Sequence, residues 1–267
     1  MLSRSRLCLL GAGFLWLGGV GAAAQENVFG KRESDTAGLI GIIYDLKQDQ
    51  KRNKTHVSAG KDYPEILFEF LERNWDESVL NRYFRSSRPL YTTQIFIPLM
   101  SANEAPKAFE VDQIMRPSAW IVHYKGQVSP PEDGTYRFIC YSDDVMAVRL
   151  NGNTVCIGGR MRNLNAHWTS PEKGNAGKAG NGALIYGDWV RLNKDEPVDL
   201  DVIVGERPGG QFCAFLMYEK MGATYPSVDG RTVYPIFQLA PEPTPQLNNE
   251  RLAPPFAQVD EVWKAHP

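Results

Sequence analysis

Hydrophobic and polar residues alternate with a period of two along most of the chain after Leu90, which predicts β-strands. The stretches LYTTQIFIP, AWIVHYKGQV and GTYRFICY show this alternation, and so do VMAVRL and TVCI, which flank Asn151-Gly152. An Asn-Gly pair between two such stretches is the strongest short signal for a β-hairpin. VDLDVIV and QFCAFLMY, joined by GERPGG, predict two further long strands. The pattern therefore predicts a mainly β chain, folded as an antiparallel β-sandwich or barrel.

Before residue 90 the pattern changes. GLIGIIYDL predicts a buried strand that starts near Leu39. YPEILFEFLERN has Pro64 at a first-turn position and predicts an amphipathic helix, since one face carries Ile66, Leu67, Phe70 and Leu71. WDESVLNRYF predicts a second short helix. We expect these two short N-terminal helices to cap the barrel or to cover a sheet edge.

The two ends of the chain differ from the part between them. MLSRSRLCLLGAGFLWLGGVGAAAQ has the basic start, apolar run and small-residue end of a signal peptide cleaved near Ala24. An uncleaved membrane anchor is the alternative. The chain becomes proline-rich after Gln238, which predicts an extended tail. The expected organisation is a signal peptide (1–24), an N-terminal extension with the two helices (25–89), a β domain (90–240) and an extended Pro-rich tail (241–267). The mature protein is expected to be secreted, periplasmic or on the cell surface.

Charge and cysteine content exclude several classes of function. The net charge is −2, with scattered lysines and arginines, which argues against nucleic acid and anionic membrane surfaces as partners. No segment after the leader is apolar enough to span a membrane. Cys140, Cys156 and Cys213 match no zinc-binding spacing. If the chain meanders through both turns at 143–144 and 151–152, Cys140 and Cys156 lie about 9–10 Å apart on either side of one strand. A disulfide needs about 4.4–6.8 Å between Cα atoms, so we predict that these two are not bonded to each other.

Catalytic motifs are not found in the sequence. There is no G-x-S-x-G turn, and GNAGKAG lacks both the hydroxyl residue after Lys178 and the upstream glycine of a phosphate-binding loop. The chain is therefore predicted to be a non-catalytic binding module rather than an enzyme. The polar stretch 160–182 has no periodicity, and loops of this length in compact domains are usually functional or disordered.

The stretch WIVHYKGQVSPPEDGTYRFICYSDDVMAVRLNGNTV resembles the PA-fourteen (PA14) domain family, β-barrel modules of toxins, adhesins and glycosidases. The resemblance rests on Gly134-x-Tyr136-x-Phe138, Ser142-Asp143-Asp144 and the Asn-Gly hairpin, and it covers roughly 90–219. In the sugar-binding members, two consecutive aspartates joined by a cis peptide hold a calcium ion that coordinates sugar hydroxyls. The resemblance thus implies a PA14-like fold, calcium as cofactor and a glycan or surface polysaccharide as partner.

For this chain the resemblance implies Asp143 and Asp144 as metal ligands. Calcium takes about six to eight oxygens, so further ligands are expected from the loop that follows; the candidates there are Asn163, Asn165, Asn175 and Asn181. Trp168, or alternatively Trp189, is expected to stack on a sugar ring. Two alternatives stay open: the acidic pair is a structural turn only, and the chain is a structural or assembly component of a surface complex with a protein partner.

Overall fold

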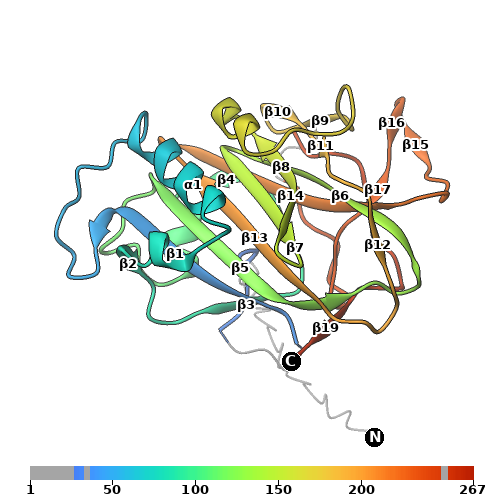
Figure 1. Ribbon diagram of the computed structural model, residues 1–267, viewed down its shortest axis with the longest axis horizontal. Helices are drawn as coiled ribbons and strands as arrows, with labels where there is room; N and C mark the ends of the chain where they lie inside the picture. The colour runs from blue at the N-terminus through green and yellow to red at the C-terminus, as the bar shows by residue number, and fades with distance from the viewer. Residues whose placement is uncertain (1–26, 33–36, 248–251) are drawn as a thin grey trace, which may run out of the picture.

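The computed structural model describes residues 27–32, 37–247 and 252–267. It confirms the predicted mainly β class, since strands far outnumber helices and the two large sheets are antiparallel (Figure 1). The predicted signal peptide lies outside the described residues, and its cleavage stays a prediction. Within the described ranges, no helix is long and apolar enough to cross a membrane.

Two large sheets pack face to face. The eight-stranded sheet has the order β2-β1-β5-β13-β7-β8, with β3 and β19 at its margins. Its strands are β1 (Leu39–Asp49), β2 (Tyr83–Arg85), β3 (Leu90–Thr92), β5 (Trp120–Ser129), β7 (Val145–Leu150), β8 (Asn153–Gly159), β13 (Val198–Glu206) and β19 (Lys264–His266). The five-stranded sheet has the order β11-β6-β14-β4, with β12 beside β6. Its strands are β4 (Phe96–Ser101), β6 (Gly134–Ser142), β11 (Ile185–Tyr186), β12 (Val190–Leu192) and β14 (Gln211–Lys220).

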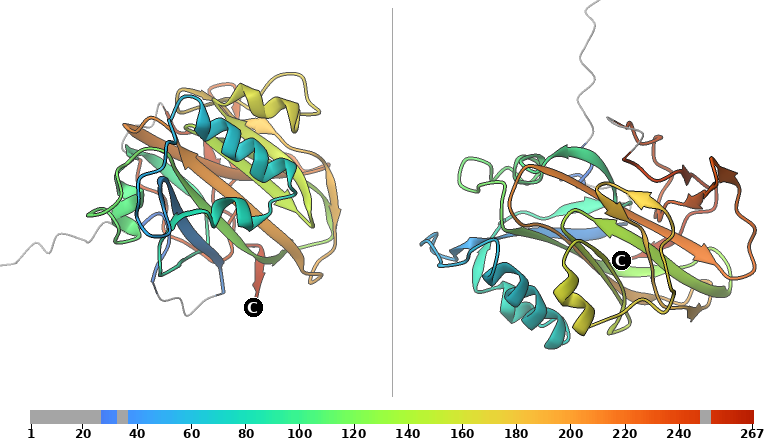
Figure 2. Two further views of the ribbon diagram at one scale, coloured as in Figure 1. Left: turned by 60° about the vertical axis from the view of Figure 1, so that its left-hand side comes forward. Right: turned by 90° about the horizontal axis from the view of Figure 1, so that it is seen from above.

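Shorter elements complete the fold (Figure 2). They are α1 (Asp62–Glu72), α2 (Glu77–Leu80), α3 (Glu104–Ala108), the 3₁₀ helix η1 (Arg162–Ala166), β9 (Lys178–Ala179), β10 (Gly182–Ala183), β15 (Ser227–Val228), β16 (Arg231–Thr232), β17 (Tyr234–Pro235) and β18 (Phe256–Ala257). The two predicted N-terminal helices are present, but the second ends at Leu80, and Tyr83 already begins a strand. That strand pairs with β1, which decides its conformation against the local helical pattern.

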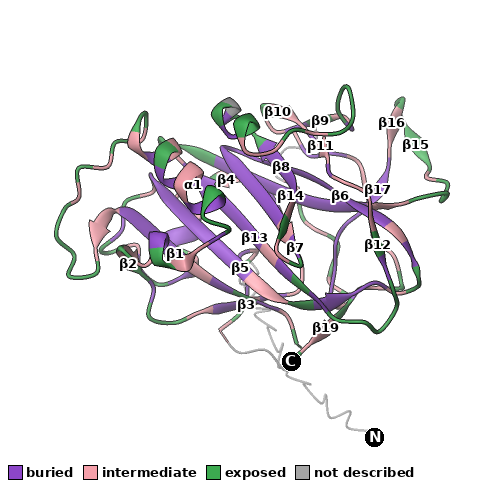
Figure 3. Cartoon of the chain, viewed as in Figure 1, coloured by how far each residue is buried: buried purple, intermediate pink, exposed green. Residues whose placement is uncertain are grey.

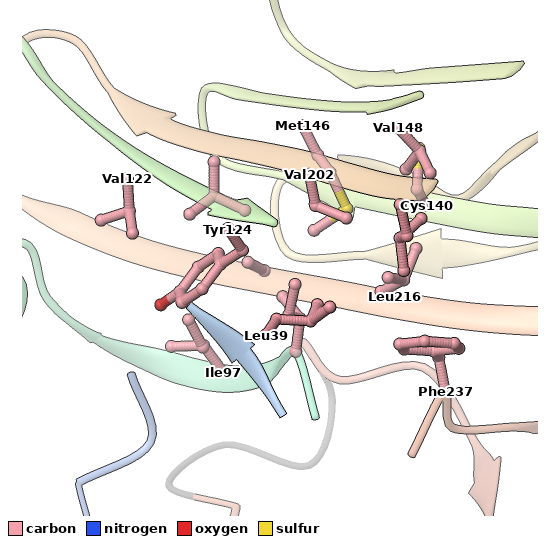
Figure 4. Close-up of a cluster of buried hydrophobic side chains, with 14 of the residues drawn as sticks. Leu39, Ile97, Val122, Tyr124, Cys140, Met146, Val148, Val202, Leu216 and Phe237 are labelled. Atoms are coloured by element: carbon pink, nitrogen blue, oxygen red, sulfur yellow. The ribbon is translucent and has the colours of Figure 1, made fainter. Parts of the chain in front are cut away.

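The period-two pattern sorts the buried side chains into layers, because successive residues of a strand face opposite sides of its sheet. Val202 of β13, Met146 of β7, and Cys140 and Leu216 of the other sheet belong to the interior between the two sheets (Figure 4). Ile203, the neighbour of Val202, belongs instead to the outer face of the eight-stranded sheet, which α1, α2 and η1 cover. The central strands are buried along most of their length (Figure 3).

Two expectations about connections were wrong. LYTTQIFIP is not one strand: β3 pairs with β1, while β4 pairs with β14 in the other sheet. The chain also does not meander through residues 143–144. β6 lies in the five-stranded sheet and β7 in the eight-stranded sheet, so this turn carries the chain across the sandwich.

Segments from both ends of the chain belong to the same sandwich. β1 pairs with β5 along Ile40–Asp45, and β19 pairs with β5 further on, with His266 opposite Gln127. Trp263 is 1% exposed and lies in the interior between the sheets, against Phe237 and Phe138. The segment after residue 252 therefore contributes Trp263 to the hydrophobic interior and β19 to the larger sheet.

Candidate functional site

The two aspartates singled out by the sequence lie where the chain crosses from one sheet to the other. The peptide bond between Asp143 and Asp144 is cis. The amide of Asp143 donates to the carbonyl of Cys213 in β14, at 3.0 Å, and the amide of Asp144 donates to the carbonyl of Gly205 in β13, at 2.9 Å. Each residue is thus tied to a different sheet, and both are buried, at 5% and 2% exposure.

Two arginines compensate the charge of this acidic turn. Nη1 of Arg160 lies 3.2 Å from Oδ1 of Asp143, and Nη2 of Arg207 lies 3.7 Å from Oδ1 of Asp144. The Arg207 amide also donates to Oδ2 of Asp144, at 3.0 Å. The side chain of Arg160 is about half exposed, at 52%, so its guanidinium lies between Asp143 and solvent. The two arginines directly follow the ends of β8 and β13 in the sequence.

A third carboxyl group, that of Glu206, is buried beside the pair at 2% exposure. Its Oε1 accepts a hydrogen bond from the Gly209 amide at 2.8 Å, and among the described residues its Oε2 has no hydrogen-bond partner. Burial, and next the charge of Asp144, raise the pKa of Glu206 to about 8. Burial also raises the pKa of Asp144, which the Arg207 amide and guanidinium oppose. Glu206 is therefore protonated at neutral pH, which avoids a third negative charge in the cluster.

Two glycines at the end of β8 let the backbone pass directly over the acidic turn. A Cβ on Gly159, whose φ is +132°, would lie 2.2 Å from the carbonyl oxygen of Asp144. A Cβ on Gly158 would lie 2.3 Å from the carbonyl oxygen of Cys140. The Arg160 amide then donates to the Asp144 carbonyl at 2.7 Å. Only residues without a side chain fit this approach.

An open groove of about 270 Å³ starts at the same two glycines. This volume lies just below the range of about 300–1,000 Å³ that is usual for ligand pockets. The walls consist of the end of β8, the first residue of β7, the first residue of β11, and residues of the segment 161–172. The lining residues are Val145, Ile157, Gly158, Gly159, Met161, Asn165, Trp168, Thr169, Ser170, Glu172 and Ile185. Apolar and polar side chains thus face one space beside the acidic turn.

The polar wall of the groove is held in place by contacts to the rest of the fold. Nε1 of Trp168 donates to Oδ2 of Asp188 at 2.9 Å, and Oγ of Ser170 donates to the carbonyl of Tyr186 at 2.7 Å. Leu164 of η1 is fully buried under the segment, in the cluster that also holds α1. These contacts fix the indole ring of Trp168 at the edge of the groove.

The predicted site residues divide into two sets. Asp143 and Asp144 form the acidic turn, and Asn165 and Trp168 line the adjacent groove. The other three asparagines are exposed: Asn163 lies on η1, Asn175 accepts a hydrogen bond from the Gly177 amide, and Asn181 lies between β9 and β10.

Trp189 lies at a different place. The guanidinium of Arg137 lies 4.3 Å from its ring centroid and 4.0 Å from that of Tyr186. Trp189 is thus engaged in a cation–π stack rather than in the walls of the groove.

The residues that sequence reasoning missed are Arg160, Glu206 and Arg207. The hydrogen bonds and ion pairs of Asp143 and Asp144 come from residues 160, 205, 207 and 213, not from the four asparagines. The one available signal was the charged pair Glu206-Arg207, which comes directly after the apolar run Val202-Ile203-Val204-Gly205.

The side chains around Asp143 and Asp144 fit a calcium ion poorly. Among the described residues, no group of three or more His, Cys, Asp or Glu side chains is arranged to hold a metal ion. Calcium takes oxygen ligands from carboxylates, carbonyls and amides, but here both aspartates already pair with guanidinium groups. Calcium binding stays a prediction, and we derive no step of ligand recognition from it.

The fold is that of a two-sheet antiparallel sandwich with a loop-built site at one end. No protein-family model matches the chain, and no curated protein matches it. Among solved structures it is similar to several PA14 domains. A PA14 sugar-binding domain from an RTX adhesin has a TM-score of 0.44 and 16% identity, covering 76% of this chain and 95% of that one.

Two further solved structures are similar at the same level. The PA14 domain of the antifreeze protein MpAFP has a TM-score of 0.41 and 16% identity, covering 76% of this chain and 92% of that one. The Epithelial Adhesin 6 A domain from Candida glabrata, solved in complex with Galb1-3GlcNAc, has a TM-score of 0.39 and 12% identity, covering 85% and 95%. Because these TM-scores are below 0.5, the function proposed next depends on the residues of this chain alone.

Proposed function

We propose that this chain is a non-catalytic carbohydrate-binding module whose ligand lies in the groove beside the acidic turn. The observation that carries the proposal is the groove itself, where the Trp168 indole stands next to Asn165, Thr169, Ser170 and Glu172. A sugar ring has apolar faces and hydroxyl edges. An aromatic ring can stack on the apolar face of the sugar, while amide, hydroxyl and carboxylate groups can form hydrogen bonds with its hydroxyls.

The role of the acidic turn in this proposal is to build one wall of the groove. Asp143 and Asp144 are too buried to meet a ligand directly, but their turn fixes the backbone of Gly158 and Gly159, which line the groove. Arg160 and Arg207 already neutralise the two aspartates. Recognition is therefore proposed to depend on the groove side chains and not to require calcium.

The test is a glycan array followed by calorimetry with the best ligand, each run with calcium and with a chelator. We expect weak binding that the chelator leaves unchanged, and a loss of about tenfold or more in affinity for Trp168→Ala, equivalent to about 1.4 kcal/mol. Trp189→Ala is the matched control, since Trp189 stacks on Arg137 instead of lining the groove. Circular dichroism of both variants checks that they are folded.

Each other outcome overturns a distinct part of the proposal. An array that stays silent in calcium would favour a structural or assembly role in an exported complex. Binding that disappears with the chelator would show that a cation takes part. Hydrolysis of a bound glycan would show that the chain is an enzyme.

A further inference from the structure

Two cysteines meet in the interior between the sheets. Cys140 belongs to β6 of the five-stranded sheet, opposite Leu216 of β14, and Cys156 belongs to β8 of the eight-stranded sheet, opposite Val148 of β7. Both are fully buried, and their Sγ atoms are 2.7 Å apart. The expected separation of about 9–10 Å assumed that both flank one strand of a single sheet. That reasoning was wrong, because the chain changes sheets at Asp143-Asp144.

The third cysteine is kept apart from this pair. Cys213 of β14 faces the other side of the five-stranded sheet, in the cluster with Phe215 and Tyr141. A Cβ on Gly180 would lie 2.8 Å from its Sγ, so the space around it is filled by the β9–β10 turn. All three cysteines of the described residues are free thiols. The fold therefore brings one defined pair of thiols together and separates the third.

We propose that Cys140 and Cys156 are the site of an intrachain disulfide that covalently joins the two sheets. In this reaction each thiol loses one proton and one electron, and an Sγ–Sγ bond forms. The oxidant is another disulfide, that of oxidised glutathione or of a thiol oxidoreductase, which is reduced to two thiols. The expected export of the chain would bring it into a compartment where such bonds persist.

The burial of the pair indicates when the bond forms. Thiol–disulfide exchange requires a thiolate and access to it. Burial, and next the contact with Cys140, raise the pKa of Cys156 well above its ordinary value. Oxidation therefore takes place while the chain folds, before the sandwich closes, and the finished bond is protected from reductants by the same burial.

The test is refolding of the protein in a glutathione redox buffer, followed by alkylation with iodoacetamide in denaturant and peptide mapping without reduction. We expect a cross-linked peptide pair that contains Cys140 and Cys156, with Cys213 alkylated. The loop that the bond closes joins residues 16 positions apart. We expect the oxidised protein to melt roughly 5–10 °C above the reduced protein.

Variants separate the pair from the third cysteine. Cys213→Ser is expected to keep the cross-link and the rise in melting temperature, whereas Cys140→Ser loses both. Complete alkylation of Cys140 and Cys156 after oxidative refolding of the unaltered chain would overturn the proposal. Recovery of a cross-link that includes Cys213 would do the same. These two refuting results, complete alkylation and a cross-link that includes Cys213, are both measured on the unaltered chain. They therefore do not depend on whether the variants fold.

Discussion

Replacing Glu206 by glutamine tests whether a protonated carboxyl group completes the acidic cluster. The folded state holds the pKa of Glu206 at about 8, against an ordinary value of 4.5. Between these two pH values the folded chain binds more protons than the unfolded chain, so stability falls as the pH rises through this window. Glutamine has a similar shape and does not ionise. The substitution E206Q should therefore remove this part of the pH dependence.

The raised pKa of Glu206 determines how strongly the free energy of unfolding changes with pH. From pH 5 to pH 8, a carboxyl group moved from 4.5 to about 8 changes the free energy of unfolding by about 3.5 kcal/mol. Relaxation of the site and entry of water lower the cost of ionising a buried carboxyl group, so we expect about 2–3 kcal/mol. At pH 5 the two proteins should be nearly equal in stability, and at pH 8 E206Q should be the more stable by this amount.

The measurement is denaturant unfolding of both proteins, followed by tryptophan fluorescence at several pH values between 5 and 8. The midpoint and slope of each denaturant transition give the free energy of unfolding, and the two values are then subtracted. If both proteins lose stability in parallel over this range, Glu206 is not protonated in the folded state, and our account of charge balance in the cluster is wrong. Glu172→Gln serves as a control, because that side chain is about half exposed and pairs with Arg137.

Three further substitutions test the packing at the acidic turn and in the core. Gly159→Ala should cost about 3 kcal/mol or more, because its Cβ would overlap the carbonyl of Asp144; Gly174→Ala, also at positive φ but with open space around it, should cost only about 1 kcal/mol. Equal costs in thermal denaturation would argue against the close approach. Trp263→Ala should cost about 3–5 kcal/mol, since this buried ring packs on Phe237, and a change below about 1 kcal/mol would show that the C-terminal segment is not part of the core.

The strands of this fold could be predicted from the sequence because their signal is local. Alternation in GTYRFICY and VDLDVIV predicts extended strands, and the structure has β6 and β13 there. The hairpin at Asn151-Gly152 was also local, and both residues have the positive φ values that such a turn requires, 45° and 82°. These features depend on neighbours within a few residues.

The assignment of strands to sheets could not be predicted in the same way. Nothing local distinguishes a hairpin turn at Asp143-Asp144 from a crossing between two sheets. The crossing is decided by pairing over long distances in sequence, such as that of Gly205 with Val145. This pairing also brings Glu206 and Arg207 to the acidic turn, whereas the sequence led us to expect the partners from the stretch 160–182, which supplies Arg160. Trp263 was missed for a similar reason, since a single aromatic residue in a proline-rich segment has no periodicity.

The placement of β19 has a consequence for the order in which the protein can fold. One edge of β5 is occupied by β13, and the other is shared end to end by β1 and β19, segments separated by more than 200 residues. During synthesis from the N-terminus, that shared edge remains half open and the interior lacks the ring of Trp263 until residues 263–266 have been made. Contacts this distant in sequence form slowly. The hydrophobic interior therefore cannot be sealed until residues 263–266 have been synthesised, however early the other strands have paired.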